Sequence, residues 1–373
     1  MADSPLVVLS CGEASGDLYC SMIARALLAR RADLRLAGIA GPLSRAAGVE
    51  PWARQESLAV MGFVEIVRYL PRFFRLGNAV VERAEREGAA LFLPIDYPGF
   101  HLRVAASMKK RGIAVLDFIP PKTWSWGRHR LGALRRSVDR SAVIFPFEEQ
   151  HYREAGVQAD FVGHPLADIH ADALATDSFE RDGLLLAPGS RKQELVRLVP
   201  ILVAAIRLLR EQGYVDSIKV SQAPGVDVRL LQPLLDAGAV LASGELFAEL
   251  RTARAAVVCS GTATVEAALA GTAHVIVYRT GALTYQIARR LASVEHIGMA
   301  NIILGRRAFP ELLQGDLTAA AVARSVRPLL DPGSEASAGQ LAAGAELRAA
   351  LGAPGCFDRV AQMALSMLPP EVA

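Results

Sequence analysis

LVVLSCGEASGD, from Leu6 to Asp17, is the stretch that decides the fold. Leu6–Ser10 is a mostly apolar run typical of a buried strand, and Gly12–Gly16 is a turn of small residues before a helical pattern from Asp17 to Arg30. A buried strand, a short turn and a helix form the repeating unit of a parallel α/β sheet. We therefore expect the chain to begin with a doubly wound α/β domain.

The same alternation of apolar runs and helical stretches continues through the first half of the chain. The runs are Leu36–Ala40, Leu91–Ile95, Val115–Ile119, Ala142–Phe145 and Phe161–Val162. They predict parallel strands joined by crossover helices. After a polar, irregular stretch that ends near Gly183, a second strand-turn-helix begins at Leu184–Ser190. We place a domain boundary in that stretch.

The second half repeats the scheme. Its apolar runs are Ile218–Val220, Val240–Leu241, Ala255–Cys259 and Val275–Tyr278. We expect a loop at Asp331–Gln340, which is rich in Gly, Ala and Ser, and a final helix at about Cys356–Leu368. The sequence thus predicts two similar α/β domains.

Composition narrows the class of protein. The chain has 373 residues, 52% hydrophobic and 21% charged, as in a folded protein of about two domains. A net charge of +3 does not indicate a general nucleic-acid binder, and the four scattered cysteines suggest neither a disulfide framework nor a zinc site. No metal-binding motif is evident. Without a long apolar run or a secretory signal, we expect a cytoplasmic protein.

Two turns in the second half suit phosphate groups. Pro188–Arg191 lies between a buried strand and a helix, where Gly189 allows close approach of the backbone and Arg191 adds a charged fork. Ser260–Thr264 repeats this arrangement, and Glu266 in the following helix could accept hydrogen bonds from ribose hydroxyls. The alternatives are an ordinary turn with a surface Arg and a helix cap with an acidic first turn. Two such turns in one sheet suggest a nucleotide diphosphate.

Asp96 is the candidate general base. It follows the strand Leu91–Ile95, and Pro94, Pro98 and Gly99 restrict its loop. We expect its carboxylate to face an interdomain cleft, where it could remove a proton from a hydroxyl. Glu13 and Ser15, in the first turn, could line the same cleft. A capping role for Asp96 is the alternative.

Residues 58–80 read as a basic, aromatic, amphipathic helix. The residues expected to meet a membrane or a lipid chain are Phe63, Val67, Arg68, Arg72, Phe73, Phe74 and Arg75. A core helix with a solvated Arg face is the alternative. The segment from Arg103 to Arg140 holds ten Lys or Arg against two acids, which favours the surface of an anionic membrane.

Ten motifs, in order over nearly the whole chain, resemble those of the bacterial lipid-A-disaccharide synthases. They are GEASGD at Gly12–Asp17, AGP at Ala40–Pro42, LAVMGFVEI at Leu58–Ile66, IDYPGF at Ile95–Phe100, FPFE at Phe145–Glu148, VGHPLAD at Val162–Asp168, APGSRKQE at Ala187–Glu194, SGTATVEAAL at Ser260–Leu269, VYR at Val277–Arg279 and NIILGR at Asn301–Arg306.

The resemblance implies an α/β fold of the GT-B glycosyltransferase architecture, with two Rossmann-like domains facing across a cleft. Residues 1–170, completed by a C-terminal helix at about 354–373, would face acceptor and membrane, and residues 171–353 would bind the UDP-sugar. The implied reaction joins UDP-2,3-diacylglucosamine to 2,3-diacylglucosamine 1-phosphate (lipid X) with inversion. It gives the β-1,6 disaccharide and UDP, without a metal or other cofactor.

The resemblance also implies roles for single residues. Asp96 would deprotonate the acceptor 6-hydroxyl, and Arg191 would stabilise the departing UDP. Residues implied to hold the nucleotide are Ser190, Gly261, Thr262 and Glu266, while Glu13, Ser15 and Asn301 would line the acceptor site. The protein would lie on the cytoplasmic face of the inner membrane and would bind no nucleic acid, and the resemblance makes a homodimer an expectation.

Two departures from the family pattern fall near the expected site. Lys122 stands where an uncharged residue is commoner, after Pro120-Pro121 in place of Ser-Pro, and His101 stands where Asn is more usual. We expect them to affect the choice of acceptor. Two alternatives stay open: an enzyme similar to UDP-N-acetylglucosamine 2-epimerase, and a non-catalytic nucleotide-sugar binder.

Overall fold

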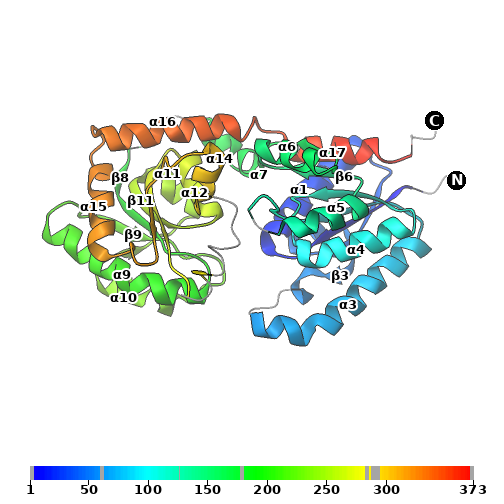
Figure 1. Ribbon diagram of the computed structural model, residues 1–373, viewed down its shortest axis with the longest axis horizontal. Coiled ribbons are helices and arrows are strands. Elements are labelled where there is room, and N and C mark those ends of the chain that lie inside the picture. Colours follow the sequence, from blue (N-terminus) through cyan, green and yellow to red (C-terminus); the bar gives the residue numbers. More distant parts are fainter. Residues whose placement is uncertain are drawn as a thin grey trace. The chain divides into compact units, whose positions relative to one another are not determined.

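The computed structural model of the protein describes residues 4–58, 63–125, 127–176, 180–281, 285–286 and 295–369, with the backbone alone for 63–70. The chain divides into two compact units (Figure 1). The first comprises Met1–Ile169 together with Leu351–Ala373, and the second comprises His170–Ala350.

The first unit contains a seven-stranded parallel sheet in the order β3-β2-β1-β4-β5-β6-β7. Its strands are β1 (Leu6–Cys11), β2 (Arg35–Ala40), β3 (Glu50–Arg54), β4 (Ala89–Ile95), β5 (Ala114–Phe118), β6 (Arg140–Val143) and β7 (Ala159–Phe161). β1 is fully buried and pairs with β2 on one side and β4 on the other. The half-buried edge strand β3 has no counterpart among the strands predicted from sequence.

Helices connect these strands and cover the sheet. They are α1 (Ala14–Arg30), α2 (Pro42–Ala46), α3 (Phe63–Arg86), α4 (Pro98–Lys110), α5 (Leu131–Ser137), α6 (Pro146–Glu154), α7 (Pro165–Ile169) and α17 (Cys356–Ser366), with short 3-10 turns at Gln55–Ser57 and Arg128–Arg130. α4 packs against α3 and α5, whereas α17 packs against α1 and α7 (Figure 1).

The last helix of the chain therefore completes the first unit. The carboxylate of Asp168 accepts hydrogen bonds from the backbone N–H groups of Gly355, Cys356 and Phe357 at 2.6–3.2 Å. The ring of Phe357 lies 5.9 Å from that of Tyr19 on α1.

The second unit contains a six-stranded parallel sheet in the order β10-β9-β8-β11-β12-β13. Its strands are β8 (Asp182–Ala187), β9 (Ile218–Val220), β10 (Val240–Leu241), β11 (Ala253–Cys259), β12 (Ala273–Tyr278) and β13 (Glu311–Leu313). β8 and β11 form its centre and are almost wholly buried. The two sheets thus share one plan, as the sequence predicted.

The helices of the second unit are α8 (Ala171–Leu174), α9 (Lys192–Glu211), α10 (Gln232–Asp236), α11 (Leu246–Thr252), α12 (Thr262–Leu269), α14 (Met299–Leu304), α15 (Ala319–Leu330) and α16 (Glu335–Ala350), with a 3-10 turn at Val228–Leu230. One prediction was wrong: most of the segment Asp331–Gln340, expected to be a loop, belongs to α16. α16 packs against α12, and a Cβ at Gly344 would lie 2.7 Å from the carbonyl oxygen of Ala268, so glycine allows this close approach.

Candidate active site

Each sheet has one point at which its strand order reverses. In the first unit the reversal falls between β1 and β4, and in the second between β8 and β11. In open α/β sheets, ligands bind beyond the carboxyl ends of the strands at such a reversal. The residues that follow these four strands are therefore the candidate site residues of each unit.

In the first unit, Asp96 follows β4 in a strained conformation. The φ angles of Asp96 and Tyr97 are 51° and 56°, in the left-handed region that residues other than glycine seldom adopt. The backbone N–H of Asp96 donates to the carbonyl of Phe118 at 2.8 Å, and its carboxylate accepts the N–H of Tyr97 at 2.8 Å. These bonds hold the carboxylate at the exit of the strand, just before α4.

The setting of Asp96 suits a general base. The residue is exposed to solvent on one side, but the protein around the carboxylate desolvates it. This desolvation raises the pKa of Asp96 above its ordinary value. The N–H of Tyr97 and the charge of Lys122 oppose this shift. A raised pKa strengthens a carboxylate as a proton acceptor near neutral pH.

A second acid, Asp117, lies near Asp96 on β5. Burial raises its pKa to about 8, and the negative charge of Asp96 adds to the shift. Asp117 is therefore protonated at neutral pH, which leaves the negative charge on Asp96. Sequence reasoning missed Asp117, although an acid inside the apolar run Val115–Ile119 was a visible signal.

His101 lies inside the first unit and is 1% exposed. Its Nδ1 bonds to the backbone carbonyl of Asp96, and its Nε2 lies 2.8 Å from the hydroxyl of Ser10 on β1. Burial lowers its pKa to about 4, so the ring is neutral and ties the Asp96 turn to the central strand. This burial does not fit the expectation that His101 affects the choice of acceptor, because a buried ring cannot contact an acceptor.

Glu13 and Ser15 are both exposed where β1 passes into α1. A Cβ at Gly12 would lie 2.3 Å from the ring of Tyr97, so the absence of a side chain there lets the Tyr97 ring pack on this turn. Burial raises the pKa of Tyr97, and the charge of Glu13 contributes. The structure thus brings the loops after β1 and β4 together through Tyr97, a residue that sequence reasoning did not single out.

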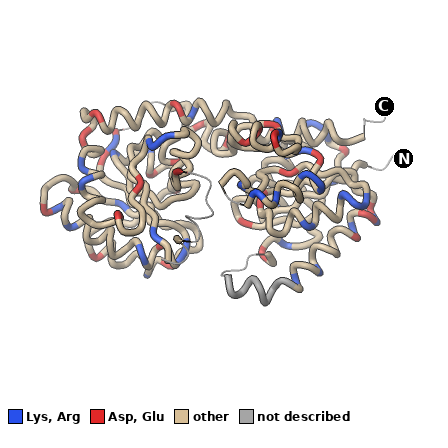
Figure 2. The backbone as a smooth tube through the Cα atoms, viewed as in Figure 1, with Lys and Arg blue, Asp and Glu red and all other residues tan. Residues whose placement is uncertain are grey.

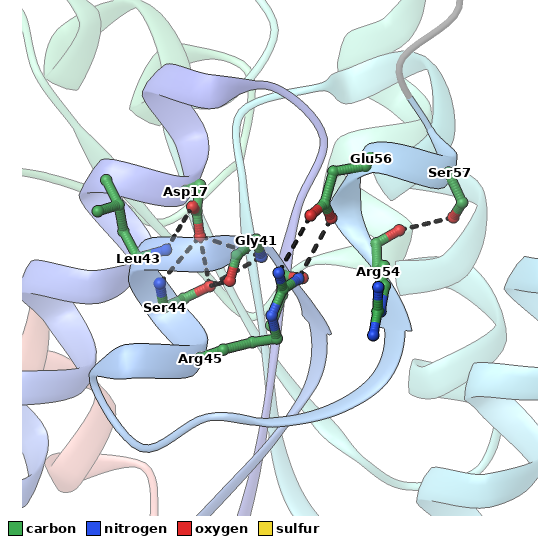
Figure 3. Close-up of polar contacts among 9 residues, drawn as sticks. Asp17, Gly41, Leu43, Ser44, Arg45, Arg54, Glu56 and Ser57 are labelled. Atoms are coloured by element: carbon green, nitrogen blue, oxygen red, sulfur yellow. Dashed lines mark hydrogen bonds and ion pairs between the residues drawn. The ribbon is translucent and has the colours of Figure 1, made fainter.

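Asp17, the last residue of the GEASGD motif, is buried and anchors α2 (Figure 3). Its carboxylate accepts hydrogen bonds from the N–H groups of Gly41, Leu43 and Ser44 at 2.9–3.0 Å, and also from the Ser44 hydroxyl. The GEASGD and AGP motifs are therefore in contact, and Asp17 stabilises the fold beneath the site.

The loop after β5 carries Lys122, which is exposed. Trp124 fixes this loop, since its Nε1 donates to the buried carboxylate of Glu148 at 2.7 Å. Glu148 also accepts the backbone N–H groups of Ile144 and Phe145 at 3.1–3.2 Å. The glutamate of the FPFE motif therefore supports the loop from within, while Lys122 keeps an accessible cation near Asp96.

In the second unit, the turn after β8 leads into α9. Gly189 has a φ of 111°, and a Cβ there would lie 2.7 Å from a carboxylate oxygen of Glu194. Ser190 and Arg191 are exposed, and the Arg191 side chain is 78% exposed. A guanidinium Nη1 of Arg191 lies 2.9 Å from Glu194, which also accepts the Arg191 N–H at 3.2 Å. The N-terminus of α9 and Arg191 together present positive charge to solvent.

The turn after β11 leads into α12 in the same way. Gly261 has a φ of 145° and precedes Thr262, the exposed first residue of α12. Glu266 is half-buried, and burial together with the charge of Glu245 raises its pKa to about 7. This turn and the Gly189 turn follow the two strands at the reversal of the second sheet, as two phosphate-binding turns require.

Asn301 lies inside the second unit with no exposed surface, in contrast to its expected place in the acceptor site. Its Nδ2 donates to the carbonyl of Phe309 and to Glu311, both at 2.8 Å, and its Oδ1 accepts the N–H groups of Ala308 and Phe309 at 2.9 Å. Since both amide hydrogens and both oxygen lone pairs are used, Asn301 fixes the segment before β13 and has no group left for a ligand.

The expected membrane-facing residues fall on α3. Arg72, Phe74 and Arg75 are exposed, whereas Phe73 is half-buried and packs its ring 6.3 Å from that of Phe100. The side chains of Phe63, Val67 and Arg68 lie outside the described residues. Lys and Arg also gather along α4 and α5 (Figure 2). Within the part of the chain described, no helix is long and apolar enough to span a bilayer.

Across those same residues, no group of three or more His, Cys, Asp and Glu side chains could hold a metal ion. The four cysteines are buried and unpaired with one another.

Comparisons of sequence point to one family. The chain matches the family model of lipid-A-disaccharide synthetase over residues 7–349. A lipid-A-disaccharide synthase of Acidobacterium capsulatum is 39% identical over 396 residues, covering 99% of this chain and 98% of the relative. The synthase of Syntrophus aciditrophicus is 37% identical over 378 residues and covers 98% of each chain.

Solved structures share the fold. The glycosyltransferase of kitacinnamycin aligns with a TM-score of 0.64 at 16% identity, over 99% of this chain and 100% of that one. A putative UDP-N-acetylglucosamine 2-epimerase from Listeria monocytogenes aligns with a TM-score of 0.63 at 11% identity, over 96% and 95%. At these identities the likeness concerns the fold alone, which is the GT-B architecture of two Rossmann-like halves.

Proposed function

Because this chain belongs to the lipid-A-disaccharide synthase family and is a glycosyltransferase of lipid A disaccharide synthesis, we propose that it joins UDP-2,3-diacylglucosamine to lipid X. The products are the β-1,6-linked disaccharide 1-phosphate and UDP. One observation supports the proposal: a carboxylate of raised pKa lies at the reversal of the first sheet, and two glycine turns that lead into helices lie at the reversal of the second.

On the acceptor side, Asp96 acts as the general base. As its carboxylate takes the proton of the acceptor 6-hydroxyl, the oxygen attacks the anomeric carbon of the donor sugar. The bond from that carbon to the UDP oxygen breaks, and its electron pair leaves with UDP. Attack from the face opposite the leaving group inverts the configuration without a covalent intermediate. Glu13 and Ser15, which are exposed where β1 passes into α1, bind acceptor hydroxyls in this proposal.

On the donor side, the second unit holds UDP. The free N–H groups at the start of α9, with Gly189 and Ser190, bind one phosphate, and those of Gly261 and Thr262 at the start of α12 bind the other. Arg191 neutralises the negative charge that develops on the leaving diphosphate. The ionised carboxylate of Glu266 accepts hydrogen bonds from the ribose hydroxyls. The proposal needs no metal and no cofactor, because Arg191 and the two helix termini supply the positive charge.

Acylated substrates explain the location we propose, which is the cytoplasmic face of the inner membrane. Exposed Arg72, Phe74 and Arg75 on α3, with the basic residues of α4 and α5, would contact anionic lipid (Figure 2). A homodimer stays an expectation from the family resemblance alone. The structural likeness to epimerases extends to the fold alone.

The experiment that tests this function supplies the purified protein with UDP-2,3-diacylglucosamine and lipid X in mixed micelles. UDP release and disaccharide are followed by mass spectrometry, with water-soluble UDP-N-acetylglucosamine as a parallel substrate. We expect disaccharide from the acylated pair and no turnover of UDP-N-acetylglucosamine alone. Epimerised UDP-N-acetylglucosamine without any disaccharide would overturn the proposal.

A further inference from the structure

The first unit contains an apolar cavity of about 390 Å³ between α3 and α4. Its volume lies in the range of small-molecule sites, roughly 300–1,000 Å³. Six of the residues around it show its character: Phe74, Gly77 and Val81 from α3, and Tyr97, Phe100 and Val104 from α4 and the loop before it. Asn78, Arg103 and Ser107 also line the cavity, but most of its wall offers apolar contact.

The cavity begins one residue from the candidate base. Tyr97, which directly follows Asp96, forms part of its wall. The ring of Tyr97 also packs on the Gly12 turn beside Glu13. A ligand in the cavity would therefore have one end next to the loops after β1 and β4, where the acceptor hydroxyl is to be deprotonated.

Gly77 keeps the two helices close at the cavity. A Cβ at this position would lie 3.2 Å from a methyl group of Val104 and 3.5 Å from the ring of Phe100. At the exposed side, the guanidinium of Arg103 lies 3.4 Å from the centre of the Phe74 ring, which is itself 43% exposed. The apolar space thus extends from a solvent-facing aromatic residue to the neighbourhood of Asp96.

We propose that this cavity binds one acyl chain of the acceptor and so selects the acceptor by chain length. The inference rests on the proposed function, because that function makes the acceptor an acylated sugar and Asp96 its base. An alkyl chain matches the apolar walls, whereas a sugar or nucleotide would leave polar groups without partners there. The acceptor chain is the one chosen, since all the residues that line the cavity belong to the first unit, which also carries Asp96.

Ser107 provides a way to fill the cavity from α4. It lines the cavity, and its hydroxyl donates only a weak hydrogen bond of 3.3 Å to the carbonyl of Arg103. With acceptors supplied as monomers in water, the wild-type KM for the acceptor should rise roughly fourfold for each methylene removed from the bound chain. Ser107→Phe should raise the KM for long-chain acceptors and flatten this dependence, because the ring occupies the space of the chain.

Lys110→Phe is the matched control, because Lys110 is exposed on the same helix outside the cavity. It adds the same ring and should leave the chain-length dependence as in wild type. Gly77→Val, which fills the cavity from α3, should reproduce the effect of Ser107→Phe. Transfer by Ser107→Phe and Gly77→Val with the wild-type dependence on acceptor chain length would overturn the inference and leave the proposed function intact.

A binding measurement separates the cavity from catalysis. The probe is cis-parinaric acid, a fatty acid whose fluorescence increases in an apolar site. We expect wild type and Lys110→Phe to bind it, and Ser107→Phe and Gly77→Val to lose that binding. Equal binding by all four proteins would contradict a chain site in the cavity. Cavity-dependent binding by a wild-type protein that forms no disaccharide would support the chain site and refute the proposed function.

Discussion

Among single residues, the proposed transfer depends most on the position of the Asp96 carboxylate. We infer that His101 positions Asp96, since its Nδ1 bonds to the Asp96 carbonyl and its Nε2 contacts Ser10. We predict that His101→Leu lowers kcat by about 10- to 100-fold, because a small displacement of a base is costly, with little change in either KM. His101→Asn keeps an amide donor and should retain more activity. Steady-state kinetics of both folded variants would show equal losses if the ring only fills space.

The pKa of Glu266 gives a second prediction at this scale. Burial raises it to about 7, so the carboxylate is protonated below that pH and can no longer accept hydrogen bonds from ribose. UDP affinity should therefore fall about tenfold between pH 8 and pH 6, as expected for one ionisation near 7. Glu266→Gln is the control, because it leaves only the titration of UDP itself. If calorimetry gave the same pH dependence of UDP affinity for wild type and Glu266→Gln, Glu266 would not be a ligand of the ribose.

Some site residues could be found from the sequence and others could not, for a physical reason. Asp96, Gly189 and Gly261 lie within two residues of the ends of buried strands, and a strand exit is visible as an apolar run that ends in a turn. The partners of Asn301 and His101 are not visible in this way. Asn301 bonds across the segment to Glu311, and His101 contacts a strand 91 residues away, so burial of both side chains depends on packing that no local pattern encodes.

At the scale of elements, Asp17 joins the start of α1 to α2 (Figure 3). Asp17→Ala would remove the acceptor of the backbone N–H groups of Leu43 and Ser44, and the N–H of Gly41 would keep only its bond to the Ser44 hydroxyl. We predict a loss of about 3 kcal/mol in the free energy of unfolding of the first unit. Glu56→Gln, which weakens the exposed Arg45–Glu56 ion pair in the same view, should change stability little. Chemical denaturation that ranked the two variants equally would contradict this role of Asp17.

For α3, we predict salt-sensitive binding to anionic vesicles through Arg68, Arg72 and Arg75. Replacing all three by Ser should remove much of the binding, since each basic residue near an anionic surface contributes about 1 kcal/mol. Vesicle flotation at low and high salt measures this effect, and neutral vesicles serve as the control. Flotation unaffected by the triple substitution would exclude α3 as the electrostatic contact.

The elements that the sequence did not predict lack the patterns that identified the other strands and helices. β3 is a half-buried edge strand, so its residues lack the continuous apolar run of a central strand. In α16, the small residues between Asp331 and Gln340 suggested a loop. However, the Ser334 hydroxyl accepts the N–H of Ser337 at the start of the helix, and an Ala-rich sequence favours a helix that can pack closely on α12.

At the scale of the whole molecule, each unit places its chemistry at the reversal of its own sheet. The first unit offers a carboxylate of raised pKa and an adjacent apolar cavity, and the second offers two glycine turns at helix N-termini with an exposed Arg. The chain returns at its end to complete the first unit through α17. This division predicts that acceptor chemistry and nucleotide binding can be disrupted separately.

The most direct test of the central claim is one comparison of wild type with Asp96→Asn, in which disaccharide formation and UDP affinity are measured on the same preparations. Our account predicts that Asn lowers the rate of transfer by about 10²- to 10⁴-fold, because the proton acceptor is lost. UDP affinity should stay as in wild type, since the nucleotide turns belong to the second unit. Transfer at the wild-type rate by Asp96→Asn would contradict the account.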